Sequence, residues 1–164
     1  MQIPYRKPGK YSQQAFDPLM TQIKFAELSR TLEKLKASRP ALAAEVARLA
    51  LLGDFSENVE YQLAKGRLRG LNQRILELGY QVDHAIIIEQ NNSGSIQVGS
   101  TVVVEVDGQK KTFQILGSVE TNPAKGIISH TSPIGAALIG HKAGETVEVM
   151  VGKSLIKHFI CSIQ

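Results

Sequence analysis

The fold follows from residues 28–82, LSRTLEKLKASRPALAAEVARLALLGDFSENVEYQLAKGRLRGLNQRILELGYQV. Apolar residues recur there at alternating spacings of three and four, first from Leu28 to Leu49 and then from Tyr61 to Val82. The two series mirror each other about Phe55. This spacing keeps one apolar face of a helix against a partner helix, and the short connection makes that partner part of the same chain. The stretch predicts an antiparallel coiled-coil hairpin that projects about 40 Å into solvent.

The apolar series breaks at Arg39, and a proline and two glycines strain the helices without ending the series. The spacing continues beyond Pro40, which predicts a bend in the first helix rather than its end. Gly66 and Gly70 weaken the second helix by about 1 kcal/mol each relative to alanine, and we interpret them as points of close approach between the two backbones. At the turn, Asp54 or Ser56 is expected to cap the second helix.

After the hairpin the apolar period changes from 3.5 to 2, which is typical of strands. The chain therefore divides into a basic arm at 1–18, the hairpin at 19–84 and a small β domain at 85–164. A short helix is expected at 134–139. The expected strands, mostly antiparallel, span residues 101–106, 112–116, 125–130, 145–151 and 155–163. The fold class is α+β.

Composition excludes several kinds of protein. The 164 residues carry a formal net charge of +4 and a single cysteine, Cys161, which cannot form an internal disulfide. The longest aliphatic run, at 85–88, is far shorter than the roughly 18 residues of a membrane span, and the first residues hold no signal core. We expect a monomeric, soluble protein of the cytoplasm, with no membrane partner and with a mild preference for nucleic acid or acidic surfaces.

Charged residues are segregated around the turn of the hairpin. Asp54, Glu57 and Glu60 lie at or near the turn, and a basic stretch follows with Lys65, Arg67, Arg69 and Arg74. Paired carboxylates suit Mg²⁺, but two of them bind it weakly without further ligands, so the rest of such a site would come from a partner. The alternative is simpler: acidic residues at a helix N-terminus often only cap it and complement its dipole.

Two motifs carry a resemblance to a known family. The turn, GDFSENVEY at 53–61, closely resembles the G-D-x-S-E-N-x-E-Y signature of the bacterial Gre-type transcript-cleavage factors. ISHTSPIGAALIGHKAGETVEV, at 128–149, is similar to the second signature of this family. Gly135 departs from the pattern, because the family often has alanine there, and the usual TPGG turn near the C-terminus is missing.

The resemblance implies a role in transcription. It implies an FKBP-like β domain that docks on RNA polymerase, with Ser132, Pro133 and Ile134 at the contact, and a hairpin that enters the secondary channel of the enzyme. Asp54 and Glu57 match the acids that hold a catalytic magnesium jointly with polymerase, so that polymerase cleaves its own backtracked RNA. The protein would then be no enzyme itself. The matching positions for support of the turn are Ser56, Asn58, Glu60 and Tyr61.

Within this resemblance, we expect the basic residues Lys65, Arg67, Arg69 and Arg74 to lie along the extruded RNA 3′ end. Three other functions stay open: a channel-binding regulator that inhibits polymerase without cleavage, a prolyl isomerase, and a structural coiled-coil adaptor. The isomerase is the weakest, because the second half has few aromatic residues to line a pocket.

Overall fold

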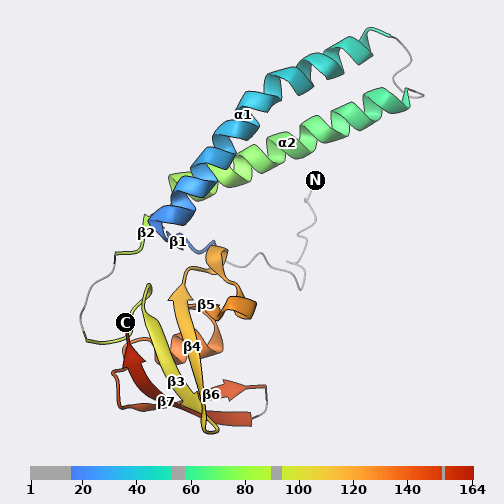
Figure 1. Ribbon diagram of the computed structural model, residues 1–164. Helices are drawn as coiled ribbons and strands as arrows, with labels where there is room; N and C mark the ends of the chain where they lie inside the picture. The colour runs from blue at the N-terminus through green and yellow to red at the C-terminus, as the bar shows by residue number, and fades with distance from the viewer. Residues whose placement is uncertain (1–15, 53–57, 90–93, 153) are drawn as a thin grey trace, which may run out of the picture.

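The computed structural model describes residues 16–52, 58–89, 94–152 and 154–164. Two long helices, α1 (Gln22–Ala50) and α2 (Val59–Asp83), run side by side as an arm that extends away from a β domain (Figure 1). The predicted α+β class, with a helical hairpin followed by a small β domain, is confirmed.

The apolar seam between α1 and α2 matches the predicted series. Its most buried side chains belong to Leu28, Leu32, Leu49, Ala64 and Leu78. Burial of one such leucine contributes about 1.5–3 kcal/mol, so the seam is the main attraction between the helices. The helix α1 continues through Pro40 without ending, as predicted. Arg39, where the apolar series breaks, is exposed.

The interpretation of the two glycines is wrong. A Cβ atom added at Gly66 or Gly70 would meet no atom within 4 Å, so the two backbones do not approach closely there. Both glycines weaken α2 and gain no packing in return.

A five-stranded sheet forms the β domain, in the order β5-β4-β3-β7-β6. Only the pairing of β4 with β5 is parallel, because a connection through two short 3₁₀ helices, η1 (Ser118–Glu120) and η2 (Pro123–Lys125), separates these strands. A type I′-like turn with positive φ at Asp107 and Gly108 joins β3 to β4. The strands and the remaining helix are β3 (Thr101–Val106), β4 (Gln109–Leu116), β5 (Ile127–Ser129), α3 (Pro133–Leu138), β6 (Thr146–Val151) and β7 (Ser154–Ile163).

A second small sheet, not predicted, closes the base of the hairpin. Strands β1 (Leu19–Met20) and β2 (Ile86–Ile87) pair in parallel, so the chain enters and leaves the hairpin side by side. Met20 is fully buried in an apolar cluster with Leu28, Leu32 and Leu78, and Val119 of η1 packs against this cluster. The hairpin and the β domain therefore share a packed joint.

The predicted basic arm, at 1–18, lies outside the described residues except for its last three. Phe16 makes an edge contact with Tyr80 of α2, at 5.2 Å between ring centroids. The carboxylate of Asp17 accepts hydrogen bonds from the backbone N–H and the hydroxyl of Ser118, both at 2.7 Å, and from the N–H of Leu19 at 3.2 Å. Phe16, Asp17 and Pro18 belong to the joint between the hairpin and the β domain.

Replacement of Gly66 or Gly70 by alanine is expected to stabilise the protein. The space around both positions is open and both lie within α2, so the gain in helix propensity is not offset by a clash. The free energy of unfolding should rise by up to about 1 kcal/mol for each substitution, measured by chemical denaturation. Gly117→Ala is the contrasting control: its Cβ would overlap the carbonyl oxygen of Leu19, so this variant should lose stability.

Asp17→Asn is expected to cost stability in a manner that depends on pH. Burial alone would raise the pKa of Asp17, but the hydrogen bonds from Ser118 and Leu19, with His130 nearby, lower it overall. A carboxylate with a lowered pKa stabilises the folded state above its unfolded pKa of about 3.9, and this contribution is lost as the pH falls through the folded pKa.

The difference in unfolding free energy between the original protein and Asp17→Asn should therefore be about 1–2 kcal/mol near neutral pH and shrink below about pH 4. The measurement is urea denaturation over a pH series. If the difference in unfolding free energy between the two proteins stays constant down to pH 3, the pKa of Asp17 is not lowered in the folded state.

Candidate functional site

The far end of the hairpin carries the acidic segment that the sequence singles out. Residues 53–57, which include Asp54, Ser56 and Glu57, lie outside the described residues. The ends of α1 and α2 on either side of them are described, so the chain ties these residues to the end of the arm opposite the β domain. With 25 residues in α2, this end lies about 37 Å along the hairpin from its base.

Asn58 is the N-cap of α2, a position at which the sequence led us to expect Asp54 or Ser56. The side-chain oxygen of Asn58 accepts a hydrogen bond from the N–H of Tyr61 at 3.0 Å, and the helix begins at Val59. Asp54 and Ser56 themselves lie outside the described residues. The role of Asn58 in support of the turn stays a prediction.

Glu60 and Tyr61 follow in the first turn of α2. Glu60 is exposed, and its charge complements the positive end of the helix dipole. Tyr61 is partly buried, with the ammonium group of Lys65 lying 5.7 Å from its ring centroid. The ring thus lies close to one basic side chain near the end of the hairpin.

Exposed apolar side chains also gather at this end, which the sequence reasoning missed. Leu51 is 87% exposed, and Leu52, Val59 and Leu63 are each more than half exposed. Their departure from the apolar spacing of the seam was the available signal. Exposed apolar patches often mark a surface that contacts another molecule.

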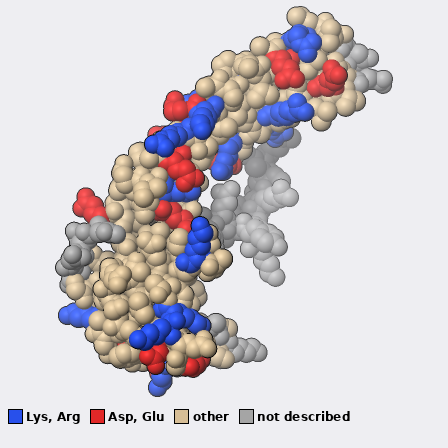
Figure 2. All heavy atoms as spheres, viewed as in Figure 1, with Lys and Arg blue, Asp and Glu red and all other residues tan. Residues whose placement is uncertain are grey.

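The basic residues of α2 do not form one stripe. A helix turns by about 100° per residue, so Lys65 and Arg69 lie on one face while Arg67 and Arg74 lie on the opposite side of the seam. Hydrogen bonds from Gln73 and Arg74 lower the pKa of Glu77, so Arg74 already has an acidic partner. Along the visible face of the arm, basic and acidic side chains are mixed (Figure 2). The segregation of charge therefore holds for α2 and not for the whole hairpin.

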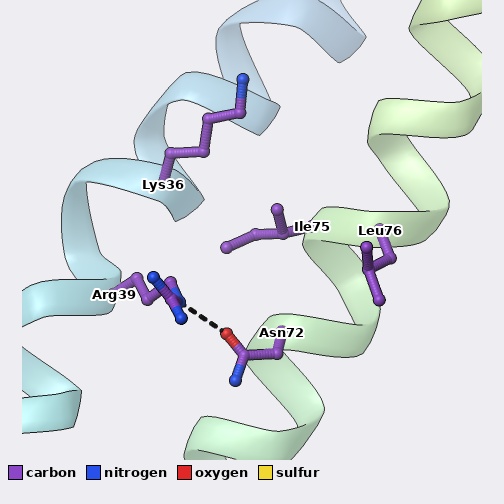
Figure 3. Close-up of a pocket in the computed structure, with 5 residues that line it drawn as sticks. All are labelled: Lys36, Arg39, Asn72, Ile75 and Leu76. Carbon is purple, nitrogen blue, oxygen red and sulfur yellow. Dashed lines mark hydrogen bonds between the residues drawn. The ribbon is translucent and has the colours of Figure 1, made fainter.

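A groove of about 420 Å³ lies between the helices near the level of Pro40 (Figure 3). The guanidinium Nε of Arg39 donates a hydrogen bond to the side-chain oxygen of Asn72 at 2.8 Å across the groove. Lys36 lines it as well, and its ammonium group is paired with Glu33 at 3.0 Å. Arg39 thus replaces an apolar seam contact by a polar link between the two helices.

The residues expected to dock on polymerase begin helix α3 of the β domain. The hydroxyl oxygen of Ser132 accepts a hydrogen bond from the N–H of Gly135 at 3.0 Å, and Pro133 occupies the first turn with its side chain exposed. Ile134 packs partly against the core. A Cβ at Gly135 would clash with the carbonyl oxygen of Ser129, so this backbone requires glycine at the position.

Among the described residues, no three histidine, cysteine or acidic side chains come together as a metal site. Glu60 is the described acid closest in sequence to Asp54 and Glu57. Hard carboxylate oxygens are the ligands that Mg²⁺ prefers, so the donor set of Asp54 and Glu57 fits this ion in kind. Within the described part of the chain, no helix is long and apolar enough to cross a membrane.

Comparison with known proteins gives matches over both parts of the chain. The family described as "Transcription elongation factor, N-terminal" matches residues 18–87, and the family described as "Transcription elongation factor, GreA/GreB, C-term" matches residues 90–164. Transcription elongation factor GreA of Nautilia profundicola is 38% identical over 135 residues, which cover 79% of this chain and 83% of that protein. GreA of Chloroflexus aurantiacus is 38% identical over 144 residues, covering 85% of this chain and 92% of its own length.

Among solved structures, GreA factor homolog 1 (Gfh1) of Thermus thermophilus aligns with 88% of this chain and 97% of its own. The sequence identity is 23% and the TM-score is 0.41, so the family assignment rests on the sequence relatives.

Asn58→Ala is expected to destabilise the start of α2. Loss of the side-chain acceptor leaves the N–H of Tyr61 without its cap, which should lower the free energy of unfolding by about 1 kcal/mol. Asn58→Ser and Asn58→Asp keep an acceptor and should stay within a few tenths of a kcal/mol of the original protein. Hydrogen exchange at the first amides of α2 reports the effect locally, and equal protection in Asn58→Ala and Asn58→Ser would contradict the assignment.

Proposed function

Because the chain belongs to the GreA/GreB family of transcription elongation factors, we propose that it acts on RNA polymerase by inserting the end of its hairpin into the enzyme. There Asp54 and Glu57 complete the site at which polymerase cleaves its own backtracked RNA. The chain itself then needs no complete active site. With such a partner, we expect the protein to act in the cytoplasm.

The observation that carries the proposal is the distance of the acidic segment from the β domain. Asn58 is the N-cap of α2 and accepts a hydrogen bond from the N–H of Tyr61, so one amide at the start of this helix is satisfied without the acidic residues. Two helices of 29 and 25 residues hold this segment far from the β domain. Flanking side chains at this end are apolar and exposed, which suits contact with another macromolecule.

Asp54 and Glu57 would hold a Mg²⁺ ion together with carboxylates of polymerase. When bound, such an ion neutralises charge on the phosphodiester and lowers the pKa of a coordinated water. Two carboxylates bind Mg²⁺ weakly by themselves, so the free factor is expected to leave the ion to the complex. Glu60, exposed in the first turn of α2, adds negative charge close by.

The basic side chains offer the extruded RNA two short contacts instead of one long track. Lys65 and Arg69 share a face of α2 and are both exposed, so they are the pair that can follow one strand of RNA. Arg67 lies on the other flank with Arg74, whose charge is shared with Glu77. We therefore assign contact with the RNA 3′ end to Lys65 and Arg69 ahead of the other two.

Replacement of the acidic pair tests the proposal. Asp54→Asn and Glu57→Gln should each lower the rate at which stalled, backtracked complexes shorten their RNA by at least tenfold, because loss of even an outer-sphere partner of a metal costs about 10–100-fold. Glu77→Gln, with the same change of charge elsewhere on the hairpin, should keep the full rate. The measurement is gel analysis of labelled RNA in purified elongation complexes at saturating factor.

Binding separates this function from its rival. If the variants compete with the original factor for polymerase and yet fail to stimulate cleavage, the acids act in the reaction. If Asp54→Asn together with Glu57→Gln cleaves RNA as fast as the original protein, the catalytic role is wrong. If the original factor slows polymerase and yields no shortened RNA, the protein is a channel-binding inhibitor instead.

A further inference from the structure

The first helix of the hairpin is capped with help from the β domain. Thr21 is the N-cap of α1, and its hydroxyl oxygen accepts a hydrogen bond from the N–H of Lys24 at 3.2 Å. In a capping box, an acid three residues after the cap returns to bond the N–H of the cap residue. That position holds Lys24 here, and the first turn of α1 has no acidic residue.

Glu120 of the β domain supplies the missing acid. One of its carboxylate oxygens accepts the backbone N–H of Thr21 at 2.7 Å, and the other accepts the hydroxyl of Thr21 at 2.6 Å. The hydroxyl proton is free for this bond because its oxygen receives the N–H of Lys24 from the other side. Both bonds involve a carboxylate and a short distance, which is the stronger class of hydrogen bond.

Asp17 makes the corresponding hydrogen bonds in the other direction, from the hairpin side to the β domain. It precedes the hairpin, and its carboxylate accepts the backbone N–H and the hydroxyl of Ser118, the first residue of η1. Glu120 is the last residue of η1. The first residue of η1, Ser118, therefore donates hydrogen bonds to Asp17 on the hairpin side. Its last residue, Glu120, accepts hydrogen bonds from Thr21 of the hairpin.

Close packing between the hairpin and the β domain restricts movement around these hydrogen bonds. The Cα of Gly117 lies so close to the carbonyl oxygen of Leu19 that a Cβ would overlap it, and Val119 packs against the cluster around Met20. The N–H groups of Ile86 and Ile88 bond the carbonyl oxygens of Pro18 and Met20 at 2.8 and 2.9 Å, which joins both chain crossings at the base. The two acids therefore act on a closely fitted joint.

We propose that Glu120 and Asp17 are positioning residues that set the direction of the hairpin relative to the β domain, and so the place where Asp54 and Glu57 arrive. The inference rests on the proposed function, in which the β domain stays outside polymerase while the arm enters it. A tilt of about 5° at the base of an arm of about 37 Å moves its end by roughly 3 Å. Misplacement of a reacting group by about 1 Å can cost a hundredfold in rate.

The test measures the direction of the hairpin separately from the stability of the protein and from its binding to polymerase. In a Cys161→Ser background, spin labels at exposed positions of α1 and β4, introduced by Lys34→Cys and Lys110→Cys, report the distance between the hairpin and the β domain in the free protein. Glu120→Gln and Asp17→Asn should broaden or shift the distance distribution. Glu148→Gln is the matched control, because its carboxylate pairs with Lys157 within the β6–β7 pair, away from the joint.

The same variants are then assayed with polymerase. Glu120→Gln should lower the cleavage rate at saturating factor by about tenfold or more, while the factor concentration for half-maximal effect changes less than about threefold. Thr21→Ser keeps both bonds to Glu120 and should match the original protein. Thr21→Val keeps the backbone bond to Glu120 but loses the hydroxyl bond and the cap on the N–H of Lys24. It should fall in between, which covers the case in which Glu120→Gln does not fold.

The inference is overturned if the distance distributions of Glu120→Gln and Thr21→Val coincide with that of Glu148→Gln. It is also overturned if all of these variants cleave at the original rate. The distances are measured without polymerase, so a failure of the original factor to stimulate cleavage would count against the proposed function and leave the joint to be judged by the distances alone.

Discussion

The apolar seam between α1 and α2 is the interaction on which the rest of this molecule depends. Side chains spaced by three and four residues bury themselves between the two helices, from Leu28 and Leu78 near the base to Leu49 and Ala64 near the far end. In proteins most of the stability of a helix comes from the packing of its apolar face rather than from helix propensity. Buried seam side chains near both ends of the helices hold the described ends of α1 and α2 together far from the β domain.

Because the two paired helices form a stiff rod, the direction of the rod at its base determines where its far end lies. At the far end, Asn58 caps the start of α2, directly after the acidic segment in the sequence. At the base, Glu120 and Asp17 exchange hydrogen bonds between the hairpin and the β domain. The seam connects the base of the hairpin rigidly to its far end. Delivery of the acidic segment to a distant site needs the seam, the cap at Asn58 and the joint at the base together.

Local patterns in the sequence predicted the features that local physics controls. The spacing of apolar residues predicted both helices and their antiparallel pairing, and the alternating pattern after residue 100 predicted most strands of the sheet. Contacts between distant residues escaped prediction. The bonds from Thr21 to Glu120 span 99 residues, and neither the β1–β2 pair nor the parallel β4–β5 pair has a sequence signal stronger than a short aliphatic run. The motif at the turn drew attention to Asp54 and Glu57, but the cap at Asn58 had to be seen in the structure.

Delivery by a rod of fixed length has a direct test. Removal of residues 37–43 and 67–73 takes one heptad from each helix, preserves the apolar spacing and shortens the arm by about 10 Å. We expect a folded helical protein that still binds polymerase but no longer stimulates RNA cleavage. A full-length variant with Arg39→Gln, Arg67→Gln and Arg69→Gln controls for the lost charge. Cleavage by the shortened protein at the rate of that control would contradict the central claim that the hairpin carries its carboxylates to a distant site.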